Sequence, residues 1–248
     1  MLEIVKFSHL LDRDYQGIRV IESNNSLAFL AMLINHENQN NQPSLLINNK
    51  GYFVNESIII NPLSKVIDIL NFSSKNSLYK MFIKDSRIDQ ENLIKSDLLS
   101  EILNFYTNLV AEDFIYINLD KAKLVKFLFQ LNDQKLINKD ILFKFFDLSN
   151  QLDKQLVIIT NFDNINISEL VAYTNKFNFI ILTNNIWDIC NSFEELEVCS
   201  IFDNKTFINI DNVSLIKEIL MQKFNVDDIE KIKESKILQN AIKSIILD

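Results

Sequence analysis

The stretch Gly17–Leu33 constrains the fold more than any other part of the chain. Residues 18–22 predict a buried strand and residues 23–26 a polar turn. The helix that follows is predicted from about Ser26 to Asn35 and is amphipathic over Leu27–Leu33. In α/β proteins this is where a phosphate-binding loop lies, and such a loop needs glycines, whose backbone N–H groups cradle phosphate, and a lysine. The turn Ser23-Asn24-Asn25-Ser26 has neither. The sequence therefore predicts the frame of a nucleotide-binding unit without its phosphate chemistry.

Two later apolar runs predict further buried strands, at Gln155–Asn161 and Phe177–Leu182, with a helix near Ser168–Lys176 between them. A strand, a helix and a strand at this spacing imply a parallel crossover. From Pro62 onward the apolar spacing is helical, apart from the short run Phe114–Ile117. We therefore expect an α/β fold with a mainly parallel sheet, divided into an α/β head (1–61 and 154–212), an inserted helical lobe (62–153) and a helical C-terminal extension (213–248).

Shorter apolar runs near the N-terminus predict additional strands. They are Leu2–Phe7, Leu45–Asn48, Tyr52–Val54 and Ser57–Ile60. Gly51, which follows Asn49 and Lys50, predicts a hairpin turn between two of these strands.

The charge distribution limits the classes of partner. The net charge of −8 disfavours nonspecific nucleic-acid binding by a monomer. Residues 62–155 carry 13 basic and 13 acidic residues, whereas residues 156–212 carry 2 and 8. A neutral, lysine-rich middle beside an acidic flank can still present one basic face, especially in an oligomer.

The remaining composition points to a cytoplasmic protein. Cys190 and Cys199 lack the spacing of a zinc site and do not make a disulfide framework. The N-terminus lacks the pattern of a signal peptide, and no apolar run is long enough to span a membrane. We expect no membrane partner.

Signals for catalysis are weak. His9 and His36 lie in different polar neighbourhoods without a metal-binding motif, and no nucleophile elbow is present. The run Leu156–Thr160, followed by Asp163, resembles the second nucleotide motif, but buried core strands often end in the same way. We therefore expect no enzyme and no bound nucleotide.

Two sets of charged residues are candidate binding sites. Glu112, Asp113 and Asp120 flank Phe114–Leu119, and oxygen ligands on a connector suit calcium, although acidic residues also end helices on solvated faces. The candidates for contact with phosphate are basic residues, which on helical faces are usually only solvated. They are Lys50, Lys80, Lys84, Arg87, Lys121, Lys123, Lys126, Lys135 and Lys139.

A family resemblance rests on the order of these parts. The N-terminal part consists of Val20-Ile21-Glu22, the polar turn, Leu27–Leu33, Leu45-Leu46-Ile47 and Lys50. The later part consists of residues 156–161, Glu169-Leu170, Tyr173-Thr174 and residues 179–182, with a helical block of suitable size between the two. Over residues 1–210 this order resembles the small spacer-acquisition protein of type II-A CRISPR systems.

The resemblance implies a function. Members of that family form a ring-shaped homotetramer whose lysine-lined hole takes in a double-stranded DNA end, without sequence readout or catalysis. They support the acquisition of new spacers together with the CRISPR integrase proteins and the effector nuclease. Calcium stabilises the family's ring through an acidic connector, which here retains only Glu112, Asp113 and Asp120. The extension 213–248 runs beyond the compact members.

Two other functions fit the sequence. The chain could be a degenerate ATPase that uses Asp163 as a metal-linked carboxylate. It could also be a structural adaptor that binds proteins through its acidic surface and C-terminal helices.

Overall fold

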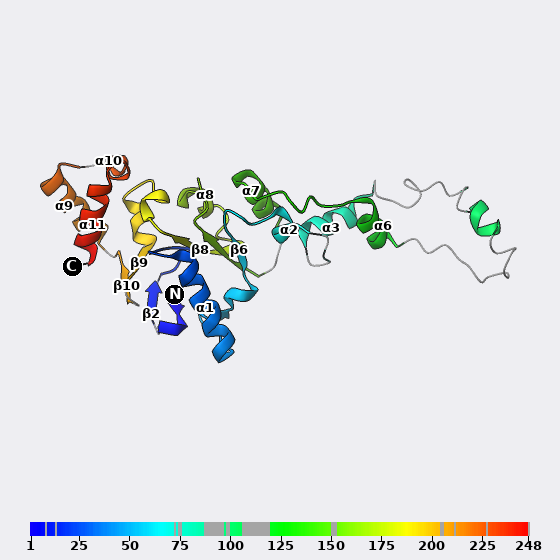
Figure 1. The fold of residues 1–248 in the computed structure, drawn as a ribbon, viewed down its shortest axis with the longest axis horizontal. Helices are drawn as coiled ribbons and strands as arrows, with labels where there is room; N and C mark the ends of the chain where they lie inside the picture. Colours follow the sequence, from blue (N-terminus) through cyan, green and yellow to red (C-terminus); the bar gives the residue numbers. More distant parts are fainter. Residues whose placement is uncertain are drawn as a thin grey trace. The chain divides into compact units, whose positions relative to one another are not determined.

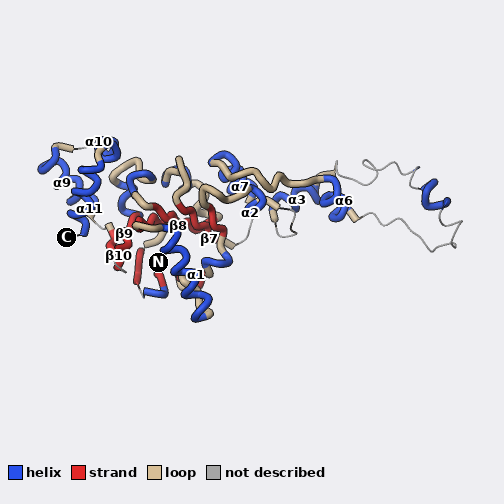
Figure 2. Tube along the Cα trace, in the orientation of Figure 1, coloured by secondary structure: helices blue, strands red, loops and turns tan. Residues whose placement is uncertain are grey.

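A six-stranded sheet lies at the centre of the larger part of the computed structural model of the chain (Figure 1), and Figure 2 draws its strands, like all strands, in red. Its strand order is β10-β9-β3-β8-β7-β6, and all neighbours are parallel except β9 and β10. The strands are β3 (Ile18–Ser23), β6 (Ile58–Ile60), β7 (Gln155–Thr160), β8 (Phe177–Thr183), β9 (Cys199–Asp203) and β10 (Thr206–Asn209). The expected α/β fold with a mainly parallel sheet is confirmed.

The structure describes residues 1–248 except 8, 13, 72, 74–75, 87–96, 98–99, 106–119, 150–152, 204–205, 211, 227 and 248. The chain divides into two compact units. The larger unit comprises residues 1–64, 137–146 and 151–248, and the smaller unit comprises residues 65–136 and 147–150. The larger unit thus includes residues 137–146, which were predicted to belong to the helical lobe, and also the C-terminal helices.

A second, antiparallel sheet in the larger unit has the order β2-β1-β4-β5. Its strands are β1 (Leu2–Ile4), β2 (His9–Asp12), β4 (Leu45–Ile47) and β5 (Lys50–Tyr52). The hairpin turn is Asn48-Asn49, with φ angles of 49° and 66°, and not Gly51, which pairs with Leu46 inside β5. The prediction at Gly51 was wrong because asparagine also adopts the left-handed conformation that two-residue hairpin turns require.

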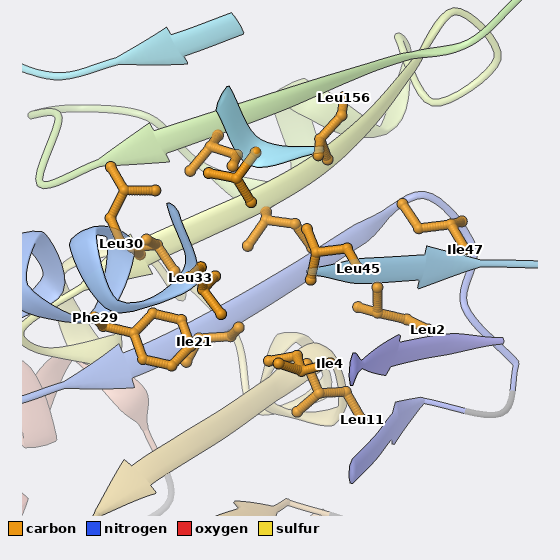
Figure 3. Close-up of a cluster of buried hydrophobic side chains, with 14 of the residues drawn as sticks. Leu2, Ile4, Leu11, Ile21, Phe29, Leu30, Leu33, Leu45, Ile47 and Leu156 are labelled. Carbon is orange, nitrogen blue, oxygen red and sulfur yellow. The ribbon is translucent and has the colours of Figure 1, made fainter. Parts of the chain in front are cut away.

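The core lies between the two sheets and helix α1 (Ser26–Asn40), as Figure 3 shows. Ile21 of the parallel sheet, Phe29 and Leu33 of α1, and Leu2 of β1 are all nearly inaccessible to solvent. Every residue of β3 and β8 is buried. Parallel strands that are covered on both faces produce such continuous apolar runs, which is why the sequence predicts them well.

Aromatic side chains cover the other face of the parallel sheet. The ring of Phe146, on α7 (Lys139–Leu148), lies 5.0 Å from that of Phe177 and 5.3 Å from that of Phe179. Helix α8 (Ile167–Val171) lies between β7 and β8 in the chain and buries Leu170.

The C-terminal helices of the larger unit are α9 (Val213–Phe224), α10 (Ile229–Glu234) and α11 (Lys236–Leu247), and α11 contacts both α9 and α10 (Figure 1). The described residues of this unit also form four 3-10 helices. They are η1 (Val5–Phe7), η2 (Val54–Glu56), η3 (Ile186–Asp188) and η4 (Glu194–Val198).

The smaller unit contains helices α2 (Val66–Ile69), α3 (Ser77–Lys84) and α6 (Lys121–Leu128). Helix α3 packs on α6, and the rings of Phe82 and Phe129 lie 4.9 Å apart. Residues 100–105 are helical, and the strand expected at Phe114–Ile117 lies outside the described residues. Among the helices of the described chain, none has both the length and the hydropathy needed to cross a bilayer.

Candidate nucleic-acid interface

The turn between β3 and α1, where a phosphate loop would lie, is closed by asparagine side chains. Asn25 Oδ1 accepts a hydrogen bond of 2.9 Å from the backbone N–H of Ala28. Asn184 Oδ1 accepts bonds from the backbone N–H and the hydroxyl of Ser26, at 3.3 and 2.8 Å. The backbone N–H groups of Ser26 and Ala28 therefore already have acceptors, and a phosphate bound to either group would have to displace an asparagine side chain.

Glu22, near the end of β3, connects this turn to the C-terminal helices. Its side chain is 6% exposed. Oε1 lies 2.5 Å from Lys243 Nζ on α11, and Oε2 accepts a 3.0 Å bond from the backbone N–H of Ile186. Helix α11 thus docks where an α/β nucleotide-binding protein opens to its ligand. The sequence carries no signal that links residues 22 and 243.

Two clefts lie at this edge of the parallel sheet. One has a volume of about 320 Å³ and includes Glu22, Lys236 and Lys243, and the other has a volume of about 610 Å³ and includes Asp163. Asp163 is exposed, and the carboxylate of Asp188 and the ammonium of Lys233 also line its cleft. The clefts contain charges of both signs, so they present no concentrated site for a polyphosphate.

Four of the candidate basic side chains lie on the smaller unit without an ion pair. Lys80 and Lys84 lie four residues apart on α3, Lys123 lies on α6, and Lys135 lies between α6 and α7. All four are exposed, and among the residues that the structure describes no carboxylate lies within ion-pair distance of them. Their charge is therefore available to an external anion.

Two further lysines of the smaller unit have internal contacts. Lys121 Nζ donates a 2.8 Å hydrogen bond to the backbone carbonyl of Asp85, which caps the C-terminus of α3. The positive charge of the Lys121 ammonium also interacts favourably with the negative, C-terminal end of the α3 helix dipole. Lys126 Nζ lies 5.6 Å from the ring centre of Tyr79, a cation–π contact that leaves its charge in place. Lys121 therefore has a structural role, and Lys126 keeps its charge.

The larger unit holds the other two lysine candidates in ion pairs. Lys50 Nζ lies 3.5 Å from the carboxylate of Asp153, and Lys139 Nζ lies 2.7 Å from that of Glu169. The Lys50 pair is largely exposed, so it is weak and can exchange for a phosphate. Arg87 lies outside the described residues.

Of the three acidic residues proposed to bind calcium, the structure describes only Asp120. Its Oδ1 caps α6, accepting hydrogen bonds from the backbone N–H groups of Ala122 and Lys123 at 2.8 and 3.4 Å. Glu112 and Asp113 lie outside the described residues. Within the described ranges, no three His, Cys, Asp or Glu side chains are grouped as a metal site.

A solved protein structure has a fold similar to that of this chain. The chain is similar to Stu0660 of Streptococcus thermophilus, whose crystal structure is known. The match has a TM-score of 0.56 and 14% sequence identity, and it covers 92% of this chain and 81% of that chain. No protein-family model and no curated protein matches the sequence. At this level of identity the likeness establishes the shared fold.

Proposed function

We propose that this protein binds the ends of double-stranded DNA without reading the base sequence and without catalysis. The observation that carries the proposal is the set of exposed lysines without carboxylate partners on the smaller unit, Lys80, Lys84, Lys123 and Lys135. Lysine binds phosphate as a point charge, so contacts of this kind supply affinity but carry no sequence information.

A chain with a net charge of −8 is repelled as a whole by the DNA backbone, and a homotetrameric ring would overcome this repulsion locally. Four copies of a lysine-bearing face would concentrate positive potential in a central hole while the acidic surface faces solvent. Large contiguous apolar patches are rare on soluble monomers. The exposed apolar side chains of the smaller unit are therefore the ones that we propose for the contact between chains. They are Met81 (51% exposed), Phe127 (81%), Leu128 (46%) and Leu136 (47%).

The biological role that we propose is the acquisition of new spacers in type II-A CRISPR immunity, alongside the integrase proteins and the effector nuclease. The support for this role is the order of sequence elements described above and a fold similar to that of Stu0660. At the place where a nucleotide would bind, Ser26 is hydrogen-bonded to Asn184 and Glu22 is paired with Lys243. These contacts favour the DNA backbone over a nucleotide as the source of the bound phosphate.

Duplex topology provides the decisive test. Binding of one sequence should be measured at low salt as a linear fragment and as a covalently closed circle of equal length. We expect retention of the linear form only, because a ring needs a free end to thread. Equal binding to both forms, or binding to neither, would contradict the proposal.

The assembly is tested separately. The mass in solution should correspond to four chains, and Phe127→Glu should lower this mass if the exposed side chain of Phe127 lies in the interface between chains.

Nucleotide binding is the second candidate, because Asp163 lies in a cleft at the carboxyl ends of β7 and β8. Calorimetry with ATP and magnesium distinguishes the two functions. We expect no heat of binding and no turnover. Binding that Asp163→Asn abolishes would favour the degenerate ATPase.

A calcium requirement remains a prediction from Glu112, Asp113 and Asp120. If calcium stabilises the ring, a calcium chelator should lower the mass in solution and the affinity for duplex, and added calcium should restore both. An unchanged mass in chelator would show that assembly does not require the ion.

A further inference from the structure

The two cysteines of the larger unit lie side by side. Cys190 lies just after η3, and Cys199 is the first residue of β9. Their Sγ atoms are 3.4 Å apart, and both side chains are fully buried. The chain between them folds back through η4, so both thiols point at the backbone carbonyl of Glu195, at 3.9 and 3.4 Å. The spacing of the two cysteines in the sequence does not indicate this contact.

The backbone on both sides of the pair is hydrogen-bonded. Cys199 pairs with Val20 in the parallel sheet, and the backbone N–H of Cys190 donates a 3.0 Å bond to Ile186. A disulfide has a sulfur–sulfur distance of about 2.0 Å, so side-chain rotations need to bring the two atoms only about 1.4 Å closer. We propose that Cys190 and Cys199 are a modification site, a dithiol that a small peroxide oxidises to an intramolecular disulfide.

The reaction has two balanced steps. One thiol, as its thiolate, attacks a peroxide oxygen, which gives a sulfenic acid and releases water from hydrogen peroxide. The second thiol then attacks the sulfenic sulfur, so that the S–S bond forms, the S–O bond breaks and a second water leaves. Together the two sulfurs lose two electrons and two protons to one molecule of peroxide. The 3.4 Å separation favours this second step over further oxidation of the first sulfur.

Burial of both thiols limits which oxidants react with them and at which pH. It raises the pKa of the Cys199 thiol, and the hydrogen bond with Cys190 adds to this effect. Oxidation should therefore be slow at neutral pH and faster at higher pH, because the thiolate is the nucleophile. A bulky oxidant cannot reach either sulfur without opening the segment between them, whereas a small peroxide needs only a brief local opening.

The segment that the disulfide would enclose supports the C-terminal helices. Lys217 Nζ on α9 lies 5.5 Å from the ring centre of Phe193, and Lys233 Nζ on α10 donates a 2.8 Å hydrogen bond to Asn191. Closing this short loop removes freedom mainly from the opened and unfolded chain. Oxidation should therefore hold α9 and α10 more firmly on the larger unit.

Peroxide treatment of the full-length folded protein tests the proposal. Remaining thiols are alkylated under denaturing conditions, and peptides are mapped without reduction. We expect a linked Cys190–Cys199 peptide pair that is about 2 Da lighter than the two separate thiol peptides, and dithiothreitol should restore both thiols. Cys190→Ala should leave Cys199 without a linked partner. Covalent dimers, or stable sulfinic acid at either position, would overturn the proposal, and so would two thiols that survive peroxide at a raised pH.

A second measurement does not depend on any variant. The oxidised and reduced forms of the same protein are compared by thermal unfolding and by amide hydrogen exchange. We expect the oxidised form to melt about 5 °C higher and to exchange more slowly in α9 and α10. A disulfide that forms but lowers Tm would show that the native geometry does not accommodate it, and would also overturn the proposal. Neither readout depends on DNA binding, so the outcome is separate from that of the proposed function.

Discussion

Gly17 has a backbone conformation that residues with a side chain rarely adopt. Its φ angle is +107°, and a Cβ atom placed on it would lie 2.8 Å from Thr174 Cβ. Its carbonyl also accepts a 2.7 Å hydrogen bond from the backbone N–H of Phe179. We expect Gly17→Ala to lower the free energy of unfolding by about 2 kcal/mol. Urea denaturation checks this, and a variant as stable as the parent would show that the turn relaxes freely.

Glu37 is a buried carboxylate that binds three backbone N–H groups. Oε1 accepts bonds from Ser44 and Val54 at 3.1 and 2.6 Å, and Oε2 accepts a bond from Asn55 at 3.1 Å. Glu37→Ala leaves these donors unsatisfied and should lower the free energy of unfolding by about 3 kcal/mol. Glu218→Ala, on the exposed face of α9, is the matched control and should change it by less than about 0.5 kcal/mol. Similar losses in both variants would argue against the role of Glu37.

His9 makes stability depend on pH. It stacks on Phe207 at a ring distance of 5.0 Å, and its pKa is lowered from 6.5, first by burial and then by the positive charge of Arg19. Below pH 6.5 the unfolded chain binds this proton more readily than the folded chain, so stability should fall as the pH drops through this range. His9→Phe removes the titration and should lose less stability between about pH 7 and about pH 5. Identical pH profiles would contradict this assignment.

At the scale of elements, an ion pair connects α11 to the parallel sheet. Lys243→Met removes the cation beside the buried carboxylate of Glu22. Because this leaves a buried charge without its partner, we expect a loss of about 2 kcal/mol and faster amide exchange in α11. Lys236→Met, an exposed lysine on the same helix, is the control and should leave exchange unchanged. Equal exchange in both variants would show that apolar packing alone holds the helix.

The sequence predicts best those elements whose residue pattern has one dominant physical cause, such as burial on both faces of a sheet. Buried parallel strands appear as unbroken apolar runs, so β7 and β8 are predicted almost to their ends. The helix predicted from Ser26 to about Asn35 continues to Asn40, because its last turn is polar and ends in a left-handed Asn41. Strand β9 was missed, because Cys199–Asp203 mixes polar and apolar residues without clear alternation.

Contacts between distant segments could not be predicted from the sequence. The pairing of Lys50 with Asp153 and of Lys139 with Glu169 depends on how the fold brings loops and helices together. The same holds for the two thiols, which are nine residues apart in the sequence and 3.4 Å apart in space. A single sequence shows which side chains can ionise, and the fold decides which of them remain unpaired.

For the whole molecule, we expect the affinity for DNA to depend more on the unpaired lysines of the smaller unit than on the ion-paired lysines of the larger unit. Asparagine side chains already accept hydrogen bonds from the backbone N–H groups of Ser26 and Ala28 at the start of α1, so the DNA backbone is the phosphate that we expect the molecule to bind. Phosphate contacts release counterions, and affinity should therefore fall steeply as salt rises.

The most direct test compares two sets of lysine variants. One replaces the unpaired lysines Lys80, Lys84, Lys123 and Lys135 by glutamine, and the other replaces the ion-paired Lys50 and Lys139. The affinity for a linear duplex is measured across a series of salt concentrations, with the mass in solution as a check on assembly. We expect the first set to lose most of its affinity, with a salt slope that falls by about one for each lysine that contacts a phosphate. We expect only a small loss of affinity for the second set. Unchanged affinity and slope in the first set, with assembly intact, would contradict the account.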